Sequence, residues 1–198
     1  RGSLNICVQI MGETDRDKAL RRYRATAGDI IWISGELGAA ALALAHLQGQ
    51  IPLPAQALVR CAARLHNPSP RVALGLALQG IAQSAIDISD GLVGDLGHIL
   101  SCSDVAGKIH LDRIPCAPDL LPHLDGLPGK QMMLAGGDDY ELCFTAPASY
   151  TQAINDIALQ LKLPLTAIGE IVSGSGLIIL DDRDRPLNLH LKSFDHFA

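Results

Sequence analysis

Residues 84–96, with the sequence SAIDISDGLVGDL, restrict the fold more than any other stretch, because a short apolar strand pattern leads directly into a helix pattern. Asp87 interrupts the apolar run where a core strand would carry Val or Ile, and burying an unpaired carboxylate costs several kcal/mol. Asp87 and Ser89 share one face of the strand by its two-residue period. Asp90 lies in the turn that follows and Asp95 in the helix. We therefore expect a cation to compensate Asp87.

The oxygen ligands crowded at this strand end suit a particular class of ion. Carboxylate and hydroxyl oxygens are typical ligands of a hard cation such as Mg2+, which in turn holds phosphorylated ligands. A second interpretation needs no ligand: Asp90 N-caps the helix that begins near Leu92, and Asp87 pairs with an arginine. The stretch alone leaves both interpretations open.

The composition indicates a folded domain with an aliphatic core. Hydrophobic residues make up 48% of the 198 residues and the mean hydropathy is +0.22, so a sizeable core can be buried. Aromatic residues make up only 4%, which leaves Ala, Leu, Ile and Val to fill that core, as is common in α/β and α+β enzymes. The net charge of −5 argues against nucleic acid as a partner, because binding a phosphate backbone needs a clustered basic surface. The basic segment at residues 16–24 either lines a polyphosphate pocket or forms a solvated loop.

Hydrophobic periodicity and Gly or Pro breaks divide the chain into strands and helices. Strands are expected at residues 4–12, 30–34, 84–89, 108–114, 140–145, 166–172 and 177–180. Helices are expected at residues 36–48, 53–65, 71–79 and 148–161 and from residue 92 onward, with a proline-rich loop at residues 115–130. Because strict βαβ units are few, this order favours an α+β fold, with a mixed sheet flanked by helices, over a doubly wound sheet.

The cysteine pattern and the hydropathy indicate a cytoplasmic protein. Five cysteines, an odd number without C-x-x-C spacing, are typical of reduced thiols in a cytosol, and the seven histidines form no zinc motif. No run of 18 apolar residues occurs, and the first residues lack the pattern of a signal peptide. We expect no membrane association.

A second candidate site is the motif GGDDYE at residues 136–141. Two glycines let a backbone approach a ligand closely, and the acids that follow can bind a metal or a cationic ring. The alternative is a tight loop whose acids are merely exposed.

Other common catalytic patterns do not occur in this sequence. It contains no G-x-x-x-x-G-K-[ST] loop and no G-x-S-x-G elbow, and GLVGDLG at residues 91–97 departs from the dinucleotide pattern G-x-G-x-x-G. Ser89 has no adjacent histidine to act as its base. Nucleophilic catalysis therefore fits poorly.

Three motifs together resemble one enzyme family. AIDISDGLVGDLGHI at residues 85–99, GGDDYELCFT at residues 136–145 and FDHF at residues 194–197 are similar to the motifs of thiamine-monophosphate kinases. These kinases belong to the superfamily of aminoimidazole ribonucleotide synthetase. The resemblance covers essentially the whole chain and implies a fold like the C-terminal domain of that synthetase. It also implies phosphorylation of thiamine monophosphate to thiamine diphosphate, with ATP and several Mg2+ ions, by a homodimer.

The resemblance assigns roles to individual residues. Asp87 and Asp90 correspond to magnesium ligands, and Ser89 and Arg22 to ATP contacts, although Arg21 and Arg24 leave the register of that arginine open.

Two substrate contacts depart from the family pattern. Asp138 stands where the family has a substrate-binding Glu, which shortens the reach by about one methylene. Phe194 replaces a Tyr or Trp beside the substrate and has no polar group on its ring. The residues at these two substrate positions therefore match the family less well than the proposed metal ligands do.

The resemblance also predicts a domain division. Residues 1–15 correspond to the last strand of an otherwise missing N-terminal domain, and residues 16–198 to a C-terminal α+β domain. The chain would then hold half of a site and be inactive alone. In the whole enzyme the acceptor phosphate is already ionised, so direct in-line transfer needs no general base, and no catalytic base is assigned.

Three other readings remain open at this point. The protein could be another ATP-dependent enzyme of the superfamily, such as the ribonucleotide synthetase. It could also be a binding domain for nucleotide or substrate without turnover. Finally, the acids could be only caps and surface ion pairs of a structural domain.

Overall fold

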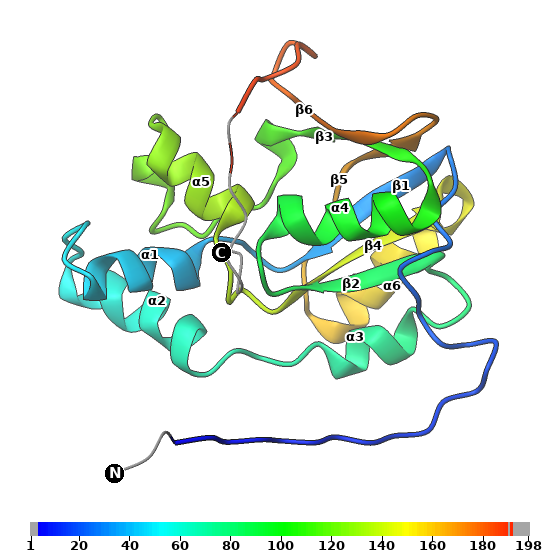
Figure 1. The fold of residues 1–198 in the computed structure, drawn as a ribbon, viewed down its shortest axis with the longest axis horizontal. Helices are drawn as coiled ribbons and strands as arrows, with labels where there is room; N and C mark the ends of the chain where they lie inside the picture. The colour runs from blue at the N-terminus through cyan, green and yellow to red at the C-terminus, as the bar shows by residue number, and fades with distance from the viewer. Residues whose placement is uncertain (1–3, 190, 192–198) are drawn as a thin grey trace.

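The fold is built on one six-stranded sheet, seen in a computed structural model that describes residues 4–189 and 191 (Figure 1). Its strands are β1 (Asp29–Ser34), β2 (Ser84–Ile88), β3 (Ala106–His110), β4 (Glu141–Pro147), β5 (Leu165–Val172) and β6 (Gly176–Leu180). The strand order is β2-β4-β1-β5-β3-β6, and all neighbours are antiparallel except β3 and β6. The expected α+β fold with a mixed sheet is confirmed.

Helices pack against both faces of this sheet (Figure 1). The α-helices are α1 (Ala39–Leu47), α2 (Ala55–His66), α3 (Val72–Ala77), α4 (Leu92–Ser103), α5 (Leu127–Ala135) and α6 (Thr151–Leu161). Short 3-10 turns occur at η1 (Leu111–Arg113), η2 (Leu121–His123) and η3 (Ala148–Tyr150). None of the helices in the described part of the chain is long and apolar enough to cross a bilayer.

The alternation of β1 creates two cores. Ile31 and Ile33 face a large core to which α1, α4 and α5 contribute, whereas Trp32 faces a smaller core with α3 and α6. In the smaller core Trp32 lies opposite Phe144 of β4, and their rings stack with centroids 6.3 Å apart. Both cores are mainly aliphatic, as the composition predicts. All five cysteines are free thiols.

Three expected elements differ from the structure. The strand expected at residues 108–114 ends at His110, and residues 111–113 form η1. Residues 4–14 form no regular secondary structure, and Leu4, Ile6, Val8 and Ile10 are 79–91% exposed. Their alternating pattern is that of a strand, but a strand needs a hydrogen-bonded neighbour, and these residues have none within the described chain. The expected loop at residues 115–130 contains η2 and the start of α5, because Pro128 occupies a first-turn position where proline is tolerated.

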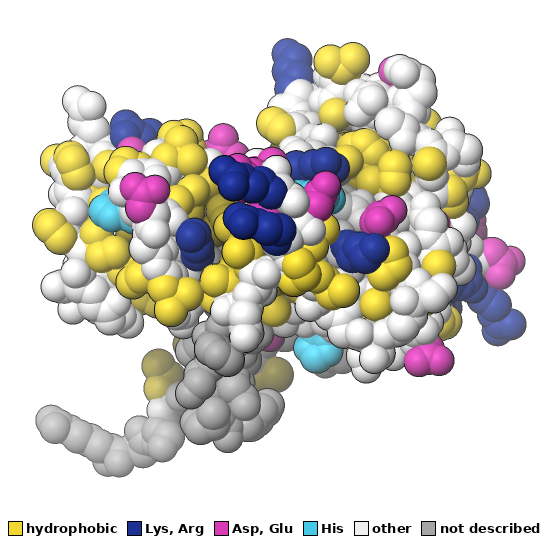
Figure 2. Space-filling view, turned by 90° about the horizontal axis from the view of Figure 1, so that it is seen from above, with side chains coloured by type: hydrophobic (Ala, Val, Ile, Leu, Met, Phe, Trp, Pro, Cys, Tyr) yellow, Lys and Arg dark blue, Asp and Glu magenta, His cyan; other side chains and the backbone are white. Residues whose placement is uncertain are grey.

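Charged side chains of both signs mix with hydrophobic ones on the molecular surface (Figure 2). Surface ion pairs such as Arg60–Asp119 and Arg185–Asp181, both at 2.7 Å, are partly solvated. Exposed pairs of this kind contribute little to stability, typically about 0–1 kcal/mol.

Candidate functional site

The antiparallel pairing of β2 with β4 brings the two sequence motifs together. Asp87 lies opposite Leu142 and Ile88 opposite Glu141, so the end of β2 adjoins the start of β4. Residues 136–140, which precede β4, therefore lie against residues 88–91, which follow from β2.

Backbone hydrogen bonds join these two segments. The Asp138 N–H donates to the Ser89 carbonyl oxygen at 2.9 Å, and the Tyr140 N–H donates to the Ile88 carbonyl oxygen at 2.8 Å. Residues 136–140 thus continue the sheet ladder past the end of the assigned strands. The backbone positions of Ser89 and Asp138 are fixed relative to each other.

Two glycines permit this close approach. A Cβ on Gly137 would lie 2.5 Å from the Ser89 carbonyl oxygen, and a Cβ on Gly91 would lie 2.7 Å from the Ala135 Cα. Gly91 also has a φ of +109°, which L side chains rarely adopt. Gly137 therefore permits contact with the first motif, and Gly91 permits contact with the end of α5.

The structure corrects the expectation that Asp87 is a buried acid. Ile86 and Ile88 are buried on one face of β2, and Asp87 on the other face is exposed. Ser89 and Asp90 are half-buried. In the described chain no Lys or Arg forms an ion pair with Asp87, which contradicts the arginine-pairing alternative.

The helix cap differs from the interpretation in which Asp90 caps the helix. Gly91, not Asp90, is the N-cap residue of α4 and makes no side-chain cap. Instead, Asp95 Oδ2 accepts the N–H groups of Ser89 and Asp90, each at 3.0 Å. Asp95 is 3% exposed, and burial raises its pKa.

Asp95 therefore has a role that the sequence analysis did not assign: it holds the turn between β2 and α4. The signal that could have found it is an acid in the first turn of a helix, where side-chain oxygens meet unpaired N–H groups.

Asp138 and Tyr140 lie near Asp87 of β2 and Asp90, which follows it. The Tyr140 hydroxyl donates to Asp138 Oδ1 at 3.3 Å. The pKa of Tyr140 is raised, mainly by burial and then by the charges of Asp138, Asp87 and Asp90. Three carboxylates and a phenol therefore share one electrostatic environment.

The backbone of this loop is strained. Asp138 has a φ of +67° and Tyr140 a φ of +50°, both in the left-handed region. Such strain persists only where surrounding contacts impose it, and it is often found at functional sites. The next two acids of the motif, Asp139 and Glu141, hold the loop from its other side.

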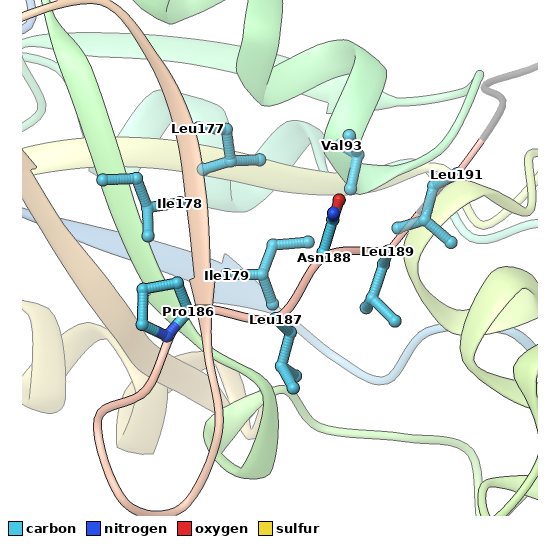
Figure 3. Close-up of a pocket in the computed structure, with 9 residues that line it drawn as sticks. All are labelled: Val93, Leu177, Ile178, Ile179, Pro186, Leu187, Asn188, Leu189 and Leu191. Carbon is cyan, nitrogen blue, oxygen red and sulfur yellow. The ribbon is translucent and has the colours of Figure 1, made fainter.

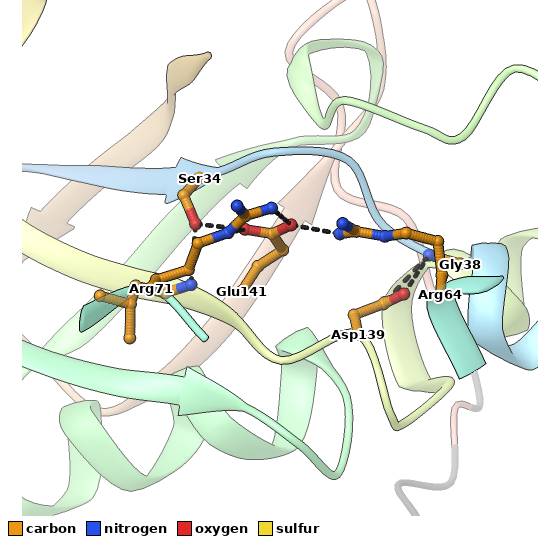
Figure 4. A network of polar contacts seen from close by, with 7 residues as sticks. Ser34, Gly38, Arg64, Arg71, Asp139 and Glu141 are labelled. Carbon is orange, nitrogen blue, oxygen red and sulfur yellow. Dashed lines mark hydrogen bonds and ion pairs between the residues drawn. The ribbon is translucent and has the colours of Figure 1, made fainter. Parts of the chain in front are cut away.

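Asp139 and Glu141 point into the protein instead of toward solvent (Figure 4). Glu141 is fully buried and accepts the Ser34 hydroxyl at 2.6 Å and Arg71 Nε at 2.6 Å, together with a bond from Arg64. The burial of Asp139 and Glu141 contradicts the alternative of a loop whose acids are merely exposed.

Asp139 is 2% exposed and accepts the Gly38 N–H at the start of α1, with oxygen distances of 3.0 and 2.9 Å. Burial raises its pKa to about 7, and the Gly38 N–H and the Arg64 charge oppose that shift.

The acidic cluster consists of Asp87, Asp90 and Asp138. Two predicted contacts lie outside it. Arg22 is exposed, and its carbonyl oxygen accepts the Ser103 hydroxyl at 3.3 Å near the end of α4. The neighbouring Arg21 carbonyl accepts the Ala85 N–H, which places this segment at the opposite end of β2 from Asp90. The structure therefore does not bring Arg22 together with Ser89. Phe194 lies outside the described residues.

Asp87 and Asp90 offer carboxylate oxygens suited to Mg2+, but they do not form a complete ligand set. Within residues 4–189 and 191, no group of three or more His, Cys, Asp or Glu side chains could hold a metal ion. Mg2+ usually keeps several waters and binds one or two carboxylates together with substrate phosphates. The donor chemistry fits, provided that other groups complete the coordination.

A hollow of about 400 Å³ lies beside the first turn of α4 (Figure 3). Val93 of α4 borders it, and the other lining residues come from β6 and the segment after it: Leu177, Ile178, Ile179, Pro186, Leu187, Asn188, Leu189 and Leu191. The hollow is largely aliphatic, with Asn188 as its polar side chain. None of its lining residues is Asp87, Ser89, Asp90 or Asp138.

Comparison with known proteins gives a consistent picture. The family described as AIR synthase related protein, C-terminal domain, matches residues 26–182. Thiamine-monophosphate kinase of Escherichia coli (strain K12) is 39% identical over 204 residues, and that of Haemophilus influenzae 38% identical over 205 residues. Each match covers all of this chain and 61% of the relative. The chain thus spans less than two thirds of the length of these curated kinases.

Solved structures show the same relationship. Thiamine-monophosphate kinase from Stenotrophomonas maltophilia K279a is 44% identical with a TM-score of 0.78, covering 84% of this chain and 54% of that one. AaThiL complexed with AMPPCP and TMP is 27% identical with a TM-score of 0.74, covering 90% and 54%. The hydrogenase maturation protein HypE of E. coli, 18% identical with a TM-score of 0.66 over 90% of this chain and 55% of that one, shares the fold. From the family match over residues 26–182, this chain belongs to the AIR synthase related protein, C-terminal domain family.

Proposed function

We propose that this chain is part of a thiamine-monophosphate kinase, which transfers the γ-phosphoryl group of ATP to thiamine monophosphate. The observation that carries the proposal is the meeting of Asp87, Ser89 and Asp90 with Asp138 at one end of β2. The curated relatives named above are kinases of this kind, and one related structure holds a nucleotide analogue and TMP.

Each wall of the cluster has a distinct proposed role. Asp87 and Asp90 bind magnesium, and the Ser89 hydroxyl contacts ATP beside them. Asp138 binds the substrate on the opposite wall. Arg22 and Phe194 are proposed to contact ATP and substrate in the whole protein. Magnesium, when bound, neutralises phosphate charge and orients the phosphates.

The residues of this chain position the reactants and supply no general base. The acceptor phosphate is ionised near neutral pH, so in-line attack needs alignment and charge neutralisation above all. Asp95 contributes by holding the N–H groups of Ser89 and Asp90, which fixes the turn that carries the proposed metal ligands.

The proposed site is completed by parts of the whole protein outside this chain. Two carboxylates are too few to hold the several Mg2+ ions proposed for the reaction. We propose that an N-terminal domain supplies further ligands, that residues 1–15 are the last strand of that domain and residues 16–198 the C-terminal domain, and that the whole protein is a homodimer. The chain alone would bind ligands weakly without turnover.

A substrate comparison tests this function. The full-length protein containing this chain is incubated with ATP and Mg2+ and with either thiamine monophosphate or formylglycinamidine ribonucleotide, and ADP release is measured. We expect release with thiamine monophosphate only. Release with the ribonucleotide alone would assign the protein to another branch of the superfamily and would overturn the proposal.

A further inference from the structure

The loop that carries Asp138 has two sides with different partners. The side chains of Asp138 and Tyr140 bond to each other, and their N–H groups bond to the end of β2. Asp139 and Glu141, which alternate with them, make their side-chain bonds to β1, the start of α1 and two arginines. One side faces the acidic cluster, and the other is anchored in the protein.

The anchor is a charged network around the buried Glu141, formed with Ser34, Arg64 and Arg71, and beside it the buried Asp139 accepts the Gly38 N–H (Figure 4). Arg71 donates to both oxygens of Glu141, from Nε and from a terminal nitrogen. This bidentate, two-point geometry fixes the orientation of the carboxylate as well as its distance. Arg64 adds a bond from the last turn of α2. The network therefore draws on α2, the start of α3, β1 and β4.

Local backbone geometry provides the space for this network. Gly35, at a φ of +62°, leaves room that a side chain would take from the Glu141 carboxylate. The Ser34 hydroxyl donates to Glu141 and also accepts the Leu142 N–H at 2.9 Å. Glu141 is thus enclosed on several sides at the start of β4, immediately after the strained residues.

We propose that Glu141 and Asp139 are positioning residues, which with Arg64 and Arg71 hold the loop at residues 136–140 so that Asp138 faces the acids of β2. The inference rests on the proposed function, because Asp138 is its substrate contact. The positive φ values of Asp138 and Tyr140 are imposed by the anchors on the alternate residues. The loop also donates to the Ser89 and Ile88 carbonyl oxygens, but the N–H groups of Ser89 and Asp90 keep their bonds to Asp95. Loss of the network should therefore disturb the substrate side of the site more than the nucleotide side.

Two arginines provide a matched test. Arg71 holds Glu141 and Arg60 holds Asp119 with the same two-point geometry, but Arg60 is 60% exposed and its bonds go to Asp119 instead of to the loop or its anchor. In the full-length protein, Arg71→Lys is expected to raise KM for thiamine monophosphate about tenfold or more, as the loss of a contact to a charged group does. KM for ATP should change by less than about twofold, since the nucleotide side keeps its own anchor. Arg60→Lys should change neither.

A merely structural role would give a different pattern. Partial unfolding lowers kcat in proportion to the active fraction and leaves both KM values unchanged. If Arg71→Lys does not fold, as judged by circular dichroism, Arg64→Lys replaces it, because Arg64 is 29% exposed and bonds only one Glu141 oxygen. In an Asp138→Asn background the arginine substitution should add no further rise in KM for thiamine monophosphate, because the contact that it positions is already lost.

Hydrogen exchange tests the anchor independently of activity. The amides of Asp138 and Tyr140, which donate to β2, should exchange faster in Arg71→Lys than in wild type, while amides of β3 and β5 stay protected. An unchanged KM for thiamine monophosphate together with unchanged exchange would overturn the inference. A wild-type protein that forms no thiamine diphosphate would instead overturn the proposed kinase function, with the exchange result still reporting on the anchor.

Discussion

At the scale of single residues, burial decides what each acid of the two motifs does. Asp87 is exposed and available to a ligand, whereas Asp95, Asp139 and Glu141 are buried and bound to N–H groups or arginines. Sequence reasoning identified the acid-rich stretches but did not separate these roles. Whether an acid is exposed or buried depends on the direction of its side chain at the strand end. That direction is determined by the residues packed around it.

Asp139 gives the protein a testable pH dependence. Its folded-state pKa of about 7 lies above the ordinary value of 3.8, so the folded protein binds this proton more tightly than the unfolded chain does. The stabilisation is complete at low pH and is lost as pH rises through about 7. The free energy of unfolding of wild type, minus that of Asp139→Asn, should therefore fall between about pH 4 and pH 7.

The expected fall is at most about 4 kcal/mol, because each pKa unit corresponds to about 1.36 kcal/mol. Chemical denaturation of both proteins at several pH values measures it. A difference that rises with pH would contradict the account of Asp139 as a buried carboxyl facing the Gly38 N–H, Arg64 and Glu141.

At the scale of elements, the turn between β2 and α4 depends on Asp95. Asp95→Ala leaves the N–H groups of Ser89 and Asp90 without their acceptor, which should cost about 1–3 kcal/mol of stability and weaken nucleotide binding. Asp95→Asn keeps an oxygen acceptor and should cost less. Thermal denaturation and calorimetry with ATP and Mg2+ on the full-length protein measure both effects. Equal losses of stability in the two variants would show that the oxygen acceptor of Asp95 does not stabilise the turn.

Hydrophobic periodicity predicted the positions of the strands and helices that have a clear apolar repeat. The strands β1, β2 and β4 and the helices α2 and α4 occur close to where apolar spacing placed them. The alternation at residues 4–12 predicted a strand that does not form in the described chain, because pairing needs a neighbour as well as a pattern. Helix α5 was missed because Gly and Pro near its start resemble a loop.

At the scale of the whole molecule, the candidate site follows from strand order. The motifs are about fifty residues apart in the sequence, and the antiparallel pairing of β2 and β4 joins them. Local patterns cannot reveal which strands become neighbours, so the meeting of the motifs could be expected only from the family resemblance.

The incompleteness of the site is also testable at this scale. The chain alone should release no ADP from ATP with thiamine monophosphate and Mg2+, whereas the full-length protein should. Two carboxylates on one wall hold too little magnesium to neutralise the phosphates fully. Sustained turnover by the chain alone would contradict the proposal that other parts of the protein complete the site.

The most direct test of the central claim is thiamine diphosphate formation by the full-length protein carrying Asp87→Asn or Asp90→Asn. Each substitution removes a proposed magnesium ligand at the end of β2, so activity should fall by orders of magnitude while the melting temperature stays near that of wild type. Asp182→Asn, on an exposed turn far along the chain, serves as the control and should retain full activity. Near-normal thiamine diphosphate formation by both site variants would contradict the claim that this acidic cluster forms one wall of the kinase site.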